Sequence, residues 1–353
     1  MKLSLIIPTY NEKENIQKLI PSLGQEFAQS NIDAEIIIVD DNSPDGTGKV
    51  IEELKKKYQN LKVIHRIGKL GLSSAVVEGF QVTTGDIFGV IDADLSHPIE
   101  KISQMYALVA GNADLVIGSR YVKGGKIEGW NLYRKILSFG ATLLARVFVN
   151  VKDPMSGFFL IRKELVVDKE INPKGFKILL ELLVKTEYKN VVEVPITFVN
   201  RVEGKSKAEI REIVYFLQNL IGYLPYRKEI VWQFLKFSFV GLIGTFINIF
   251  ILYILTEYAR IYYLISALCA FLVALSTNFI FNKIWTFGEK ISEQIEKKYV
   301  NFFLVSTSAL SVNLFFLYIL TEFLGIYYII SGILAIGISL MINFIGNKIW
   351  TFR

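Results

Sequence analysis

Hydrophobic residues are distributed unevenly along the chain and divide it into two parts. Up to about residue 205, short runs of Ile, Val and Leu alternate with segments whose apolar residues recur at helical spacing. Continuous apolar strands separated by helices are typical of a mainly parallel sheet covered on both faces. From about residue 231 onward, apolar residues dominate. The pattern therefore predicts an α/β domain over 1–205 and a membrane domain over 231–353.

The apolar runs of the first part predict five strands separated by helices. We expect strands over 3–8, 35–40, 62–66, 87–92 and 114–119, and helices over 12–28, 46–58, 71–82 and 98–110. In open parallel sheets, ligands bind outside the carboxyl ends of the strands. The groups at those ends are Pro8 to Glu12, Asp40-Asp41, Arg66, Asp92 to Asp94 and Gly118 to Arg120. Carboxylates and cations should therefore converge on one rim of the sheet.

Four apolar segments of the second part approach the ~20 residues that a helix needs to cross a bilayer. They cover 233–255, 263–282, 299–320 and 327–346. Two motifs recur with an offset of 65 positions: Y-I-L-T-E from 253 and 318, and N-F-I-x-N-K-I-W-T-F from 278 and 343. Recurrence at a fixed offset indicates a duplicated unit. We predict four transmembrane helices in two duplicated hairpins, 233–287 and 298–352.

The basic residues that flank these segments fall on one side of the predicted membrane domain. They are Arg227, Lys228, Lys283, Lys290, Lys297, Lys298, Lys348 and Arg353, whereas the two hairpin loops carry only Arg260. Cytoplasmic loops carry an excess of Lys and Arg. The sequence therefore predicts an integral membrane protein whose first domain and both termini are cytoplasmic. The mean hydropathy of +0.40 is also too high for an ordinary soluble domain.

The segment between the two parts, 206–230, has the pattern of an amphipathic helix. Ser206 and Glu209 match a capping box, and an apolar stripe at helical spacing runs from Ile210 to Leu224. A helix of this kind directly before a membrane span is typical of the membrane interface. The alternative is a core helix of the first domain.

The stretch G-V-I-D-A-D-L-S-H-P at 89–98 ends a buried strand in two aspartates. No G-x-G-x-x-G follows the first strand and no G-x-x-x-x-G-K-[ST] occurs, which disfavours dinucleotide dehydrogenases and P-loop enzymes. Carboxylates would repel a nucleotide's phosphates unless a divalent cation lay between them. Alone, the motif could equally be a polar turn with Pro98 opening a helix. Its place among the other rim groups favours a metal site.

Seven motifs occur in the order seen in family 2 glycosyltransferases, which the chain resembles over 1–207. They are I-I-P-T-Y-N-E-x-E-N-I, I-I-I-V-D-D-N-S-P-D-G-T, G-K-L-G-L, D-A-D-L-S-H-P, G-S-R-Y, D-P-M-S-G-F-F and R-V-E-G-K-S-K. The pattern looks most like dolichyl-phosphate (polyprenyl-phosphate) mannose synthases. The C-terminal repeat resembles four-span domains associated with polyprenyl-phosphate glucosyl transfer. The resemblance implies a Rossmann-like nucleotide-sugar domain of GT-A type.

The resemblance also implies roles for individual rim residues. Those expected around the base and ribose of the donor are Pro8, Tyr10, Glu12, Val39, Asp41 and Lys69. Asp92 would contact the ribose or the metal, and Asp94 would bind the Mg²⁺ or Mn²⁺ ion that bridges the diphosphate; Ala93 lies between them. The family usually has Gln where Ser96 stands, which leaves direct coordination, coordination through water, or no third ligand open.

Two anionic substrates require cations. Arg120 follows a predicted strand and is a candidate for catalysis and for binding the acceptor phosphate. Asn131, Arg134 and Ser138 share one face of a predicted helix and adjoin an apolar stripe, so this helix could receive a phosphate headgroup at the membrane surface. An ordinary surface helix with a solvated Arg is the alternative.

Four further residues lie in the later motifs. Arg201 and Lys205 could close over the donor phosphates or the acceptor, and Lys205 is a candidate for catalysis. The alternative is a basic patch attracted to anionic lipid. Asp153 or Glu181 could hydrogen-bond the transferred sugar, although Glu181 could equally be a cap or an ion-pair residue.

The resemblance implies an inverting transfer of mannose from GDP-mannose to a polyprenyl (dolichyl) phosphate, with no nucleic-acid partner. A phosphate monoester is largely ionised at neutral pH, so no dedicated catalytic base is expected. UDP-glucose or another UDP-sugar is the alternative donor. A non-catalytic lipid carrier or flippase is the alternative of a different class, which the intact Asp92/Asp94 pair disfavours.

Overall fold

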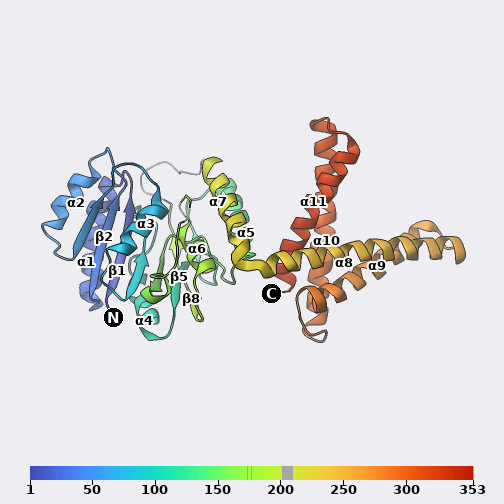
Figure 1. Cartoon of the computed structure of the whole chain (residues 1–353), viewed down its shortest axis with the longest axis horizontal. Coiled ribbons are helices and arrows are strands. Elements are labelled where there is room, and N and C mark those ends of the chain that lie inside the picture. Colours follow the sequence, from blue (N-terminus) through green and yellow to red (C-terminus); the bar gives the residue numbers. More distant parts are fainter. Residues whose placement is uncertain (173, 176, 201–209, 353) are drawn as a thin grey trace. The chain divides into compact units, whose positions relative to one another are not determined.

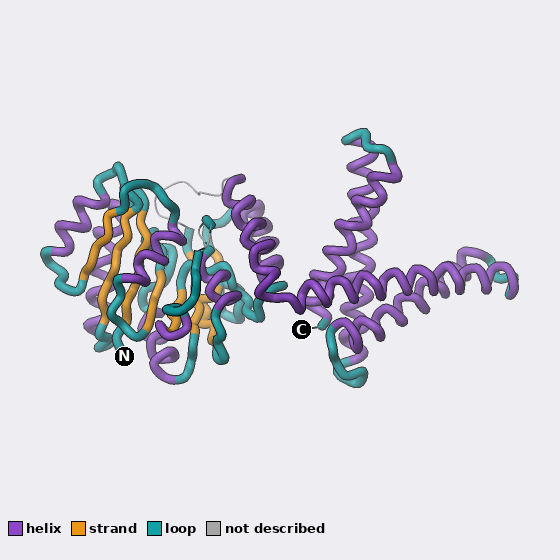
Figure 2. The backbone as a smooth tube through the Cα atoms, in the orientation of Figure 1, coloured by secondary structure: helices purple, strands orange, loops and turns teal. Residues whose placement is uncertain are grey.

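The computed structural model describes residues 1–352 except 173, 176 and 201–209. The chain divides into two compact units, Met1–Tyr226 and Arg227–Arg353. Figure 1 colours them in sequence order, and Figure 2 separates the mixed helix-and-strand composition of the first unit from the helices of the second.

The first unit is built on a seven-stranded sheet with the order β3-β2-β1-β4-β7-β5-β8. Its strands are β1 Leu3–Thr9, β2 Ala34–Asp40, β3 Leu61–His65, β4 Ile87–Val90, β5 Leu115–Ser119, β7 Phe159–Arg162 and β8 Val191–Pro195. A second, two-stranded sheet pairs β6 Lys126–Ile127 with β9 Thr197–Phe198 in parallel. The predicted α/β fold with a mainly parallel sheet is therefore confirmed.

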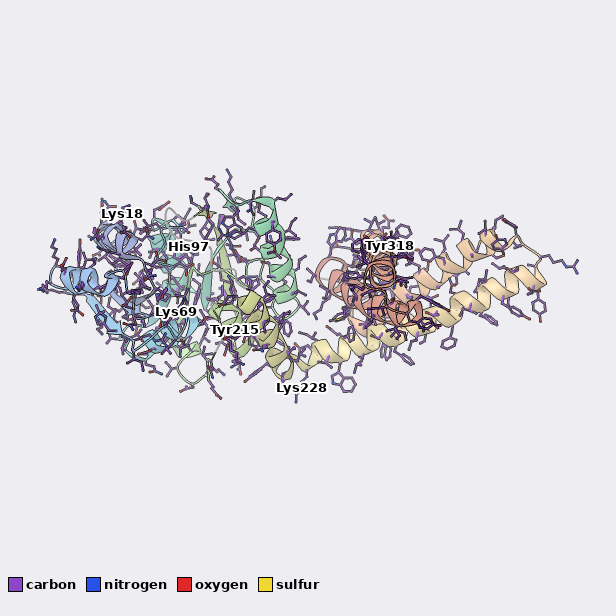
Figure 3. All side chains as sticks on the ribbon, turned by 90° about the horizontal axis from the view of Figure 1, so that it is seen from above. Lys18, Lys69, His97, Tyr215, Lys228 and Tyr318 are labelled. Atoms are coloured by element: carbon purple, nitrogen blue, oxygen red, sulfur yellow. The ribbon has the colours of Figure 1, made fainter. Side chains whose placement is uncertain are left out.

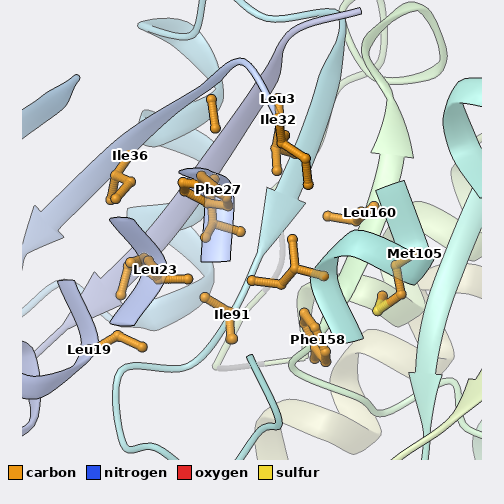
Figure 4. Packing of buried hydrophobic residues seen from close by; sticks show 14 of the residues in the cluster. Leu3, Leu19, Leu23, Phe27, Ile32, Ile36, Ile91, Met105, Phe158 and Leu160 are labelled. Atoms are coloured by element: carbon orange, nitrogen blue, oxygen red, sulfur yellow. The ribbon is translucent and has the colours of Figure 1, made fainter. Parts of the chain in front are cut away.

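Helices cover both faces of the large sheet, as the continuous apolar strands require. One core contains residues of α1 Lys13–Gln29, α2 Thr47–Lys55 and α4 Lys101–Gly111. The other contains residues of α3 Leu72–Gln81, α5 Leu132–Arg146, α6 Ile178–Lys185 and α7 Ile210–Tyr223. Figure 4 shows how the first core joins Leu19, Leu23 and Phe27 of α1 to Ile91 and Phe158.

One strand, β7, runs against the direction of its neighbours. It pairs antiparallel with both β4 and β5, with Val90 and Ile117 each opposite Phe159. The start of an antiparallel strand lies at the same edge as the ends of its neighbours. The segment 153–158 therefore joins the rim between the ends of β4 and β5, which the pattern of strands along the sequence did not predict.

The amphipathic segment before the membrane helices packs partly on the first unit. Leu220 and Tyr223 of α7 are buried in the second core, and Phe216 lies against it. On another side of α7, Ile213, Val214, Leu217 and Ile221 are exposed. One apolar side of helix α7 is therefore covered by the rest of the first unit, and another apolar side is exposed.

The second unit contains four helices long and apolar enough to cross a membrane, as predicted. They are α8 Lys228–Tyr253, α9 Tyr263–Phe281, α10 Ile295–Tyr318 and α11 Tyr328–Gly346. The helical stretch that includes α8 starts at Glu212, so it also contains most of α7. The main helix pairs are α8 with α9 and α10 with α11, which are the two copies of the sequence repeat.

Aromatic contacts join the two hairpins with a twofold regularity. The Phe237–Phe344 ring centroids are 5.6 Å apart, and so are those of Phe302 and Phe279, their counterparts 65 positions away. Phe287 and Phe352, which are counterparts of each other, stack at 4.5 Å. The duplication therefore extends from the sequence to the packing between the copies.

Candidate active site

The two aspartates of the D-A-D motif follow β4 at the rim of the sheet. Asp94 is buried, and its Oδ1 accepts a hydrogen bond from the Ser96 N–H at 3.1 Å. Leu95 between them has φ of 59°, a left-handed conformation that is uncommon for a bulky side chain. Its side chain packs against the first core, which holds this turn in place. Strained backbone of this kind often occurs at functional sites.

Asp92 is held from two sides. His97 Nε2 donates to Asp92 Oδ2 at 3.3 Å, and the imidazole is buried between the rings of Phe158 and Phe198. On the other side, a Cβ added to Gly157 would lie 2.3 Å from Asp92 Oδ2, so the carboxylate fits only because residue 157 has no side chain. Figure 3 marks His97 in the first unit. Sequence analysis overlooked both His97 and Gly157, although each lies in a quoted motif.

The donor set of this loop suits a hard divalent cation. It consists of the carboxylates of Asp92 and Asp94 and the hydroxyl of Ser96, whose buried Oγ has no hydrogen-bond partner among the described residues. No group of three His, Cys, Asp or Glu side chains that could hold a metal occurs in the part of the chain that the structure describes. Mg²⁺ and Mn²⁺ accept such a set, because substrate phosphates and water complete the shell.

The ends of β1 and β2 form the other half of the rim. Asp41 is buried and accepts from Arg66 at 2.6 Å and from the Gly71 N–H at 2.7 Å. Arg66 also pairs with Glu78 at 3.0 Å. One oxygen of Asp41 therefore holds the G-K-L-G-L loop at Gly71, and the other holds Arg66, which itself donates to the Gly71 carbonyl at 3.2 Å.

The remaining residues expected at the nucleotide lie around this loop. Lys69 Nζ lies 4.4 Å from the centre of the Tyr10 ring, and Figure 3 marks Lys69. Glu12 accepts from Asn15 at 2.7 Å. Pro8 and Val39 are paired in the sheet and buried. Ala93 is buried within residues 92–96, the loop that carries Asp92, Asp94 and Ser96 and is called the metal loop below. The predicted donor-binding residues up to Asp94 thus lie along neighbouring strand ends.

Arg120 is engaged by the loop that β7 brings to the rim. Its Nε and one terminal NH₂ group each donate to Asp153 at 2.7 Å, and its backbone N–H donates to the same carboxylate at 2.9 Å. Burial acts to lower the pKa of Arg120, but Asp153 outweighs burial and raises it. Asp153 has no exposed surface. Two residues predicted for separate roles thus form one buried ion pair.

Helix α5 presents the predicted acceptor residues. Asn131 caps it by accepting from the Arg134 N–H at 2.9 Å. The Arg134 guanidinium stacks on Trp130, 4.1 Å from the ring centre, and donates to Asn200 at 3.0 Å. Ser138 lies 3.2 Å from the Tyr121 hydroxyl. Five large apolar residues of α5 are exposed: Leu132, Tyr133, Ile136, Leu137 and Phe139.

Aromatic residues connect α5 with the metal loop. The Trp130 and Phe198 centroids are 5.4 Å apart, and the Phe198 and His97 centroids are 5.1 Å apart. The Val199 N–H donates to the Ser96 carbonyl at 3.1 Å. The β9 segment therefore contacts both the helix expected to bind the acceptor and the loop expected to bind the metal.

Two basic candidates and one acidic candidate complete the predicted set. Arg201 and Lys205 lie outside the described residues. Glu181 is buried in α6 and accepts from the Asn172 N–H and from Lys185, both at 2.7 Å, and from the Tyr223 hydroxyl at 3.4 Å. Its carboxylate therefore ties α6 to the preceding loop and to α7.

Lys177 is a basic residue of the rim that sequence analysis missed. It lies just before α6, is half-buried, and donates to the Met155 carbonyl at 3.4 Å. Its pKa is lowered to about 8, mainly by burial and also by the charge of Arg120, whereas Asp92, Asp153 and Glu212 oppose the shift. No local pattern marks Lys177, because its neighbours on the rim come from distant segments.

Comparison with known proteins identifies the family. Residues 4–169 match the Glycosyl transferase family 2 model, and residues 236–352 match the GtrA/DPMS transmembrane domain model. A dolichol-phosphate mannosyltransferase of Pyrococcus furiosus is 41% identical over 99% of this chain and 98% of its own length. The chain belongs to the dolichol-phosphate mannosyltransferase family.

Two further relatives match a smaller share of this chain. Dolichol-phosphate mannosyltransferases of Mycosarcoma maydis and Saccharomyces cerevisiae are 39% and 37% identical, over 64% and 62% of this chain and 79% and 85% of their own lengths. Membership in the family makes this chain a glycosyltransferase, as the motifs predicted. The transmembrane family model and the four apolar helices make it an integral membrane protein.

Solved structures of lower similarity include glucosyl-3-phosphoglycerate synthase from Mycobacterium tuberculosis. One of them, in complex with Mn²⁺, uridine-diphosphate and glucosyl-3-phosphoglycerate, is 18% identical with a TM-score of 0.47, over 64% of this chain and 79% of that one. Another, in complex with Mg²⁺ and uridine-diphosphate, has a TM-score of 0.46 at 18% identity, over the same shares of the two chains.

Proposed function

We propose that this protein transfers mannose from GDP-mannose to a polyprenyl (dolichyl) phosphate and inverts the anomeric centre, so that the product is β-linked. The whole-length relative that bears the name dolichol-phosphate mannosyltransferase carries this proposal. The rim supports it, because carboxylates for a metal and cations for phosphates meet there. The intact D-A-D loop argues against a non-catalytic lipid carrier or flippase.

Asp92 and Asp94 would hold Mg²⁺ or Mn²⁺, with Ser96 as the third oxygen donor of the loop. When bound, the ion would neutralise the diphosphate of the donor and stabilise it as it leaves. His97 and Gly157 position Asp92 for this role. Because Leu95 is anchored in the core, the loop keeps both carboxylates in place before substrate binds.

The acceptor phosphate would attack the anomeric carbon of mannose directly. A phosphate monoester has a second pKa of about 6, so no side chain has to remove a proton from it at neutral pH. The chain's contribution is to hold both anions in line. We assign Pro8, Tyr10, Glu12, Val39, Asp41 and Lys69 to the nucleotide and Arg134 and Ser138 to the acceptor. Asp153 then holds Arg120 in place of contacting the sugar.

Helices α5 and α7 would place this site at the membrane surface. Their exposed apolar residues include Leu132 and Tyr133 of α5 and Ile221 of α7, which are 73%, 71% and 68% exposed. Apolar sides of this extent are typical of helices that lie in a lipid interface. The basic flanks of the spans favour a cytoplasmic location for the first unit and both termini.

A donor panel tests the proposal. The purified full-length protein, Mn²⁺ and a polyprenyl phosphate are incubated with labelled GDP-mannose, UDP-glucose and other nucleotide sugars in parallel. We expect a lipid-linked sugar from GDP-mannose. Product from UDP-glucose alone would establish the alternative donor, and no product from any donor would contradict an enzymatic role.

A further inference from the structure

We propose that the membrane unit binds an uncharged, hydroxyl-bearing headgroup of a membrane lipid in a cavity between its helices. The cavity has a volume of about 290 Å³, and each of the four spans contributes residues to its lining. Figure 1 labels the helices of these spans α8 to α11. The site is separate from the transfer reaction, because no residue assigned to the donor, the acceptor or the metal lines it.

The polar groups of the lining are amides and hydroxyls. They belong to Thr245, Asn248, Asn278, Asn282, Ser306 and Asn343. None of the described residues that line this cavity is charged. An asparagine amide has an acceptor oxygen and donor hydrogens, and a hydroxyl group likewise donates and accepts. The lining therefore suits an uncharged hydroxyl group and provides no opposite charge for a phosphate.

The two copies of the sequence repeat differ at this cavity. In the second copy, the Ser306 hydroxyl donates to Asn343 Oδ1 at 3.4 Å. Their counterparts 65 positions earlier are Gly241 and Asn278, so the first copy has the amide but not the hydroxyl. Asn278 Oδ1 is buried and has no hydrogen-bond partner among the described residues. Because an unsatisfied polar group is costly inside a membrane, a ligand that donates to this oxygen is favoured.

A second pair of positions differs in the same way. In the second copy, Asn313 donates to the Ser339 hydroxyl at 3.4 Å. Their counterparts in the first copy are Asn248 and Ala274, and both of these residues line the cavity. The first copy therefore has both asparagines and neither of the serines that bond them in the second copy.

Small residues of the first copy leave room for a ligand. Gly244 and Thr245 line the cavity where the second copy has Ala309 and Leu310. A Cβ added to Gly241 would meet no atom within 4 Å, so this position faces open space. Thr245 is exposed, so the cavity reaches the surface of the membrane unit. Because that surface belongs to membrane-spanning helices, a ligand reaches the cavity from the bilayer, and we infer that a lipid carries the hydroxyl group.

The test compares the binding of dioleoylglycerol, which has one free hydroxyl group, with that of two related lipids. Acetylated dioleoylglycerol has this hydroxyl blocked, and dioleoyl phosphatidic acid carries a phosphate on it. Native mass spectrometry of the full-length protein in lauryldimethylamine oxide, a detergent without hydroxyl groups, counts the bound lipids and gives their affinities. Competition by free glycerol distinguishes a hydroxyl carried by a lipid from one carried by a soluble polyol.

The variants exchange residues between the two copies. G241S/A274S gives the first copy both serines of the second copy, and N278L removes the amide whose oxygen has no partner. G337S is the matched control, because open space also surrounds Gly337 of α11 and this residue does not line the cavity.

We expect the wild type to bind dioleoylglycerol about 10-fold more tightly than either related lipid, as for one net hydrogen bond. G241S/A274S should weaken the binding of dioleoylglycerol by about 10-fold, because its serines occupy the space and bond the asparagines. N278L should bind dioleoylglycerol and its acetylated form with equal affinity. G337S should match the wild type, and free glycerol should not compete.

Four results would each overturn the inference: no lipid bound by the wild type, equal affinity for dioleoylglycerol and its acetylated form, tighter binding of phosphatidic acid, or competition by glycerol. Wild-type behaviour of both G241S/A274S and N278L would overturn it as well. If G241S/A274S does not fold, G241S replaces it under the same criteria, because open space at this position admits a side chain. Binding is measured without a donor sugar, so the outcome does not depend on the proposed transfer reaction.

Discussion

The two units of this protein use polar and apolar residues in opposite ways. On the rim of the first unit, the important groups occur once, and partners distant in sequence hold them, as Gly157 holds Asp92 and Asp153 holds Arg120. In the second unit, the same aromatic contact occurs twice, once for each copy of the repeat. A single substitution on the rim should therefore abolish a function, whereas one in the membrane unit should remove only half of a duplicated contact.

The largest expected effect is that of Asp94→Ala. Loss of a buried carboxylate from the metal loop should reduce transfer by about 10³-fold or more, because the metal stabilises the leaving diphosphate. Labelled lipid-linked sugar and Mn²⁺ affinity measure the effect, with the melting temperature as a check on folding. Unchanged turnover would mean that the rim tolerates single substitutions as well as the membrane unit does.

Gly157→Ala tests whether one methyl group beside Asp92 is enough to reduce transfer. The new Cβ would lie 2.3 Å from Asp92 Oδ2, so either the carboxylate or the loop has to move. We expect about a 10- to 100-fold loss of transfer, since small displacements of a catalytic group are costly, with a parallel loss of Mn²⁺ affinity. Gly140→Ala in α5 is the control, because open space surrounds its position.

The membrane unit provides a symmetric test. Phe279→Leu and Phe344→Leu remove equivalent rings, and each should destabilise the unit by about 1 kcal/mol. Thermal unfolding in detergent should give nearly equal shifts for the two variants, with transfer activity retained below the melting temperature. Clearly unequal shifts would show that the two copies are not energetically equivalent.

An effect of similar size on stability is expected from a buried network away from the rim. Glu35 accepts from Lys62, Ser4 and the Thr84 N–H at 2.8, 2.5 and 2.6 Å. Burial acts to raise the pKa of Glu35, but these hydrogen bonds lower it to about 2. Because the folded pKa is below the ordinary value, the ionised form stabilises the fold above about pH 4.5, and this contribution is lost as the pH falls toward 2.

Glu35→Gln should therefore lower the free energy of unfolding by about 1 kcal/mol at pH 7. The difference from the wild type should shrink as the pH falls from 4.5 toward 2, and chemical unfolding over that range measures it. A difference that is constant with pH would show that the carboxylate charge contributes nothing. Metal affinity at pH 7 should be unchanged, in contrast to the rim variants.

Much of the architecture followed from the sequence alone. The alternation of apolar runs and helical segments predicted the parallel strands, and the direction of those strands brought Asp41, Asp92 and Asp94 to one rim. The 65-residue offset predicted two hairpins, since a repeat is visible without knowledge of contacts. Periodicity and repeats can be read from the order of the residues, and neither requires knowledge of which distant segments contact each other.

The tertiary structure decided which rim groups contact one another. The reversed direction of β7 placed Asp153 against Arg120 and Gly157 against Asp92, although these residues are 33 and 65 positions apart. In the same way, Lys177, which precedes α6, donates to the Met155 carbonyl of the loop before β7. Pairing and burial determine whether a charge is matched within the protein, and they arise from contacts between distant segments that no local pattern records.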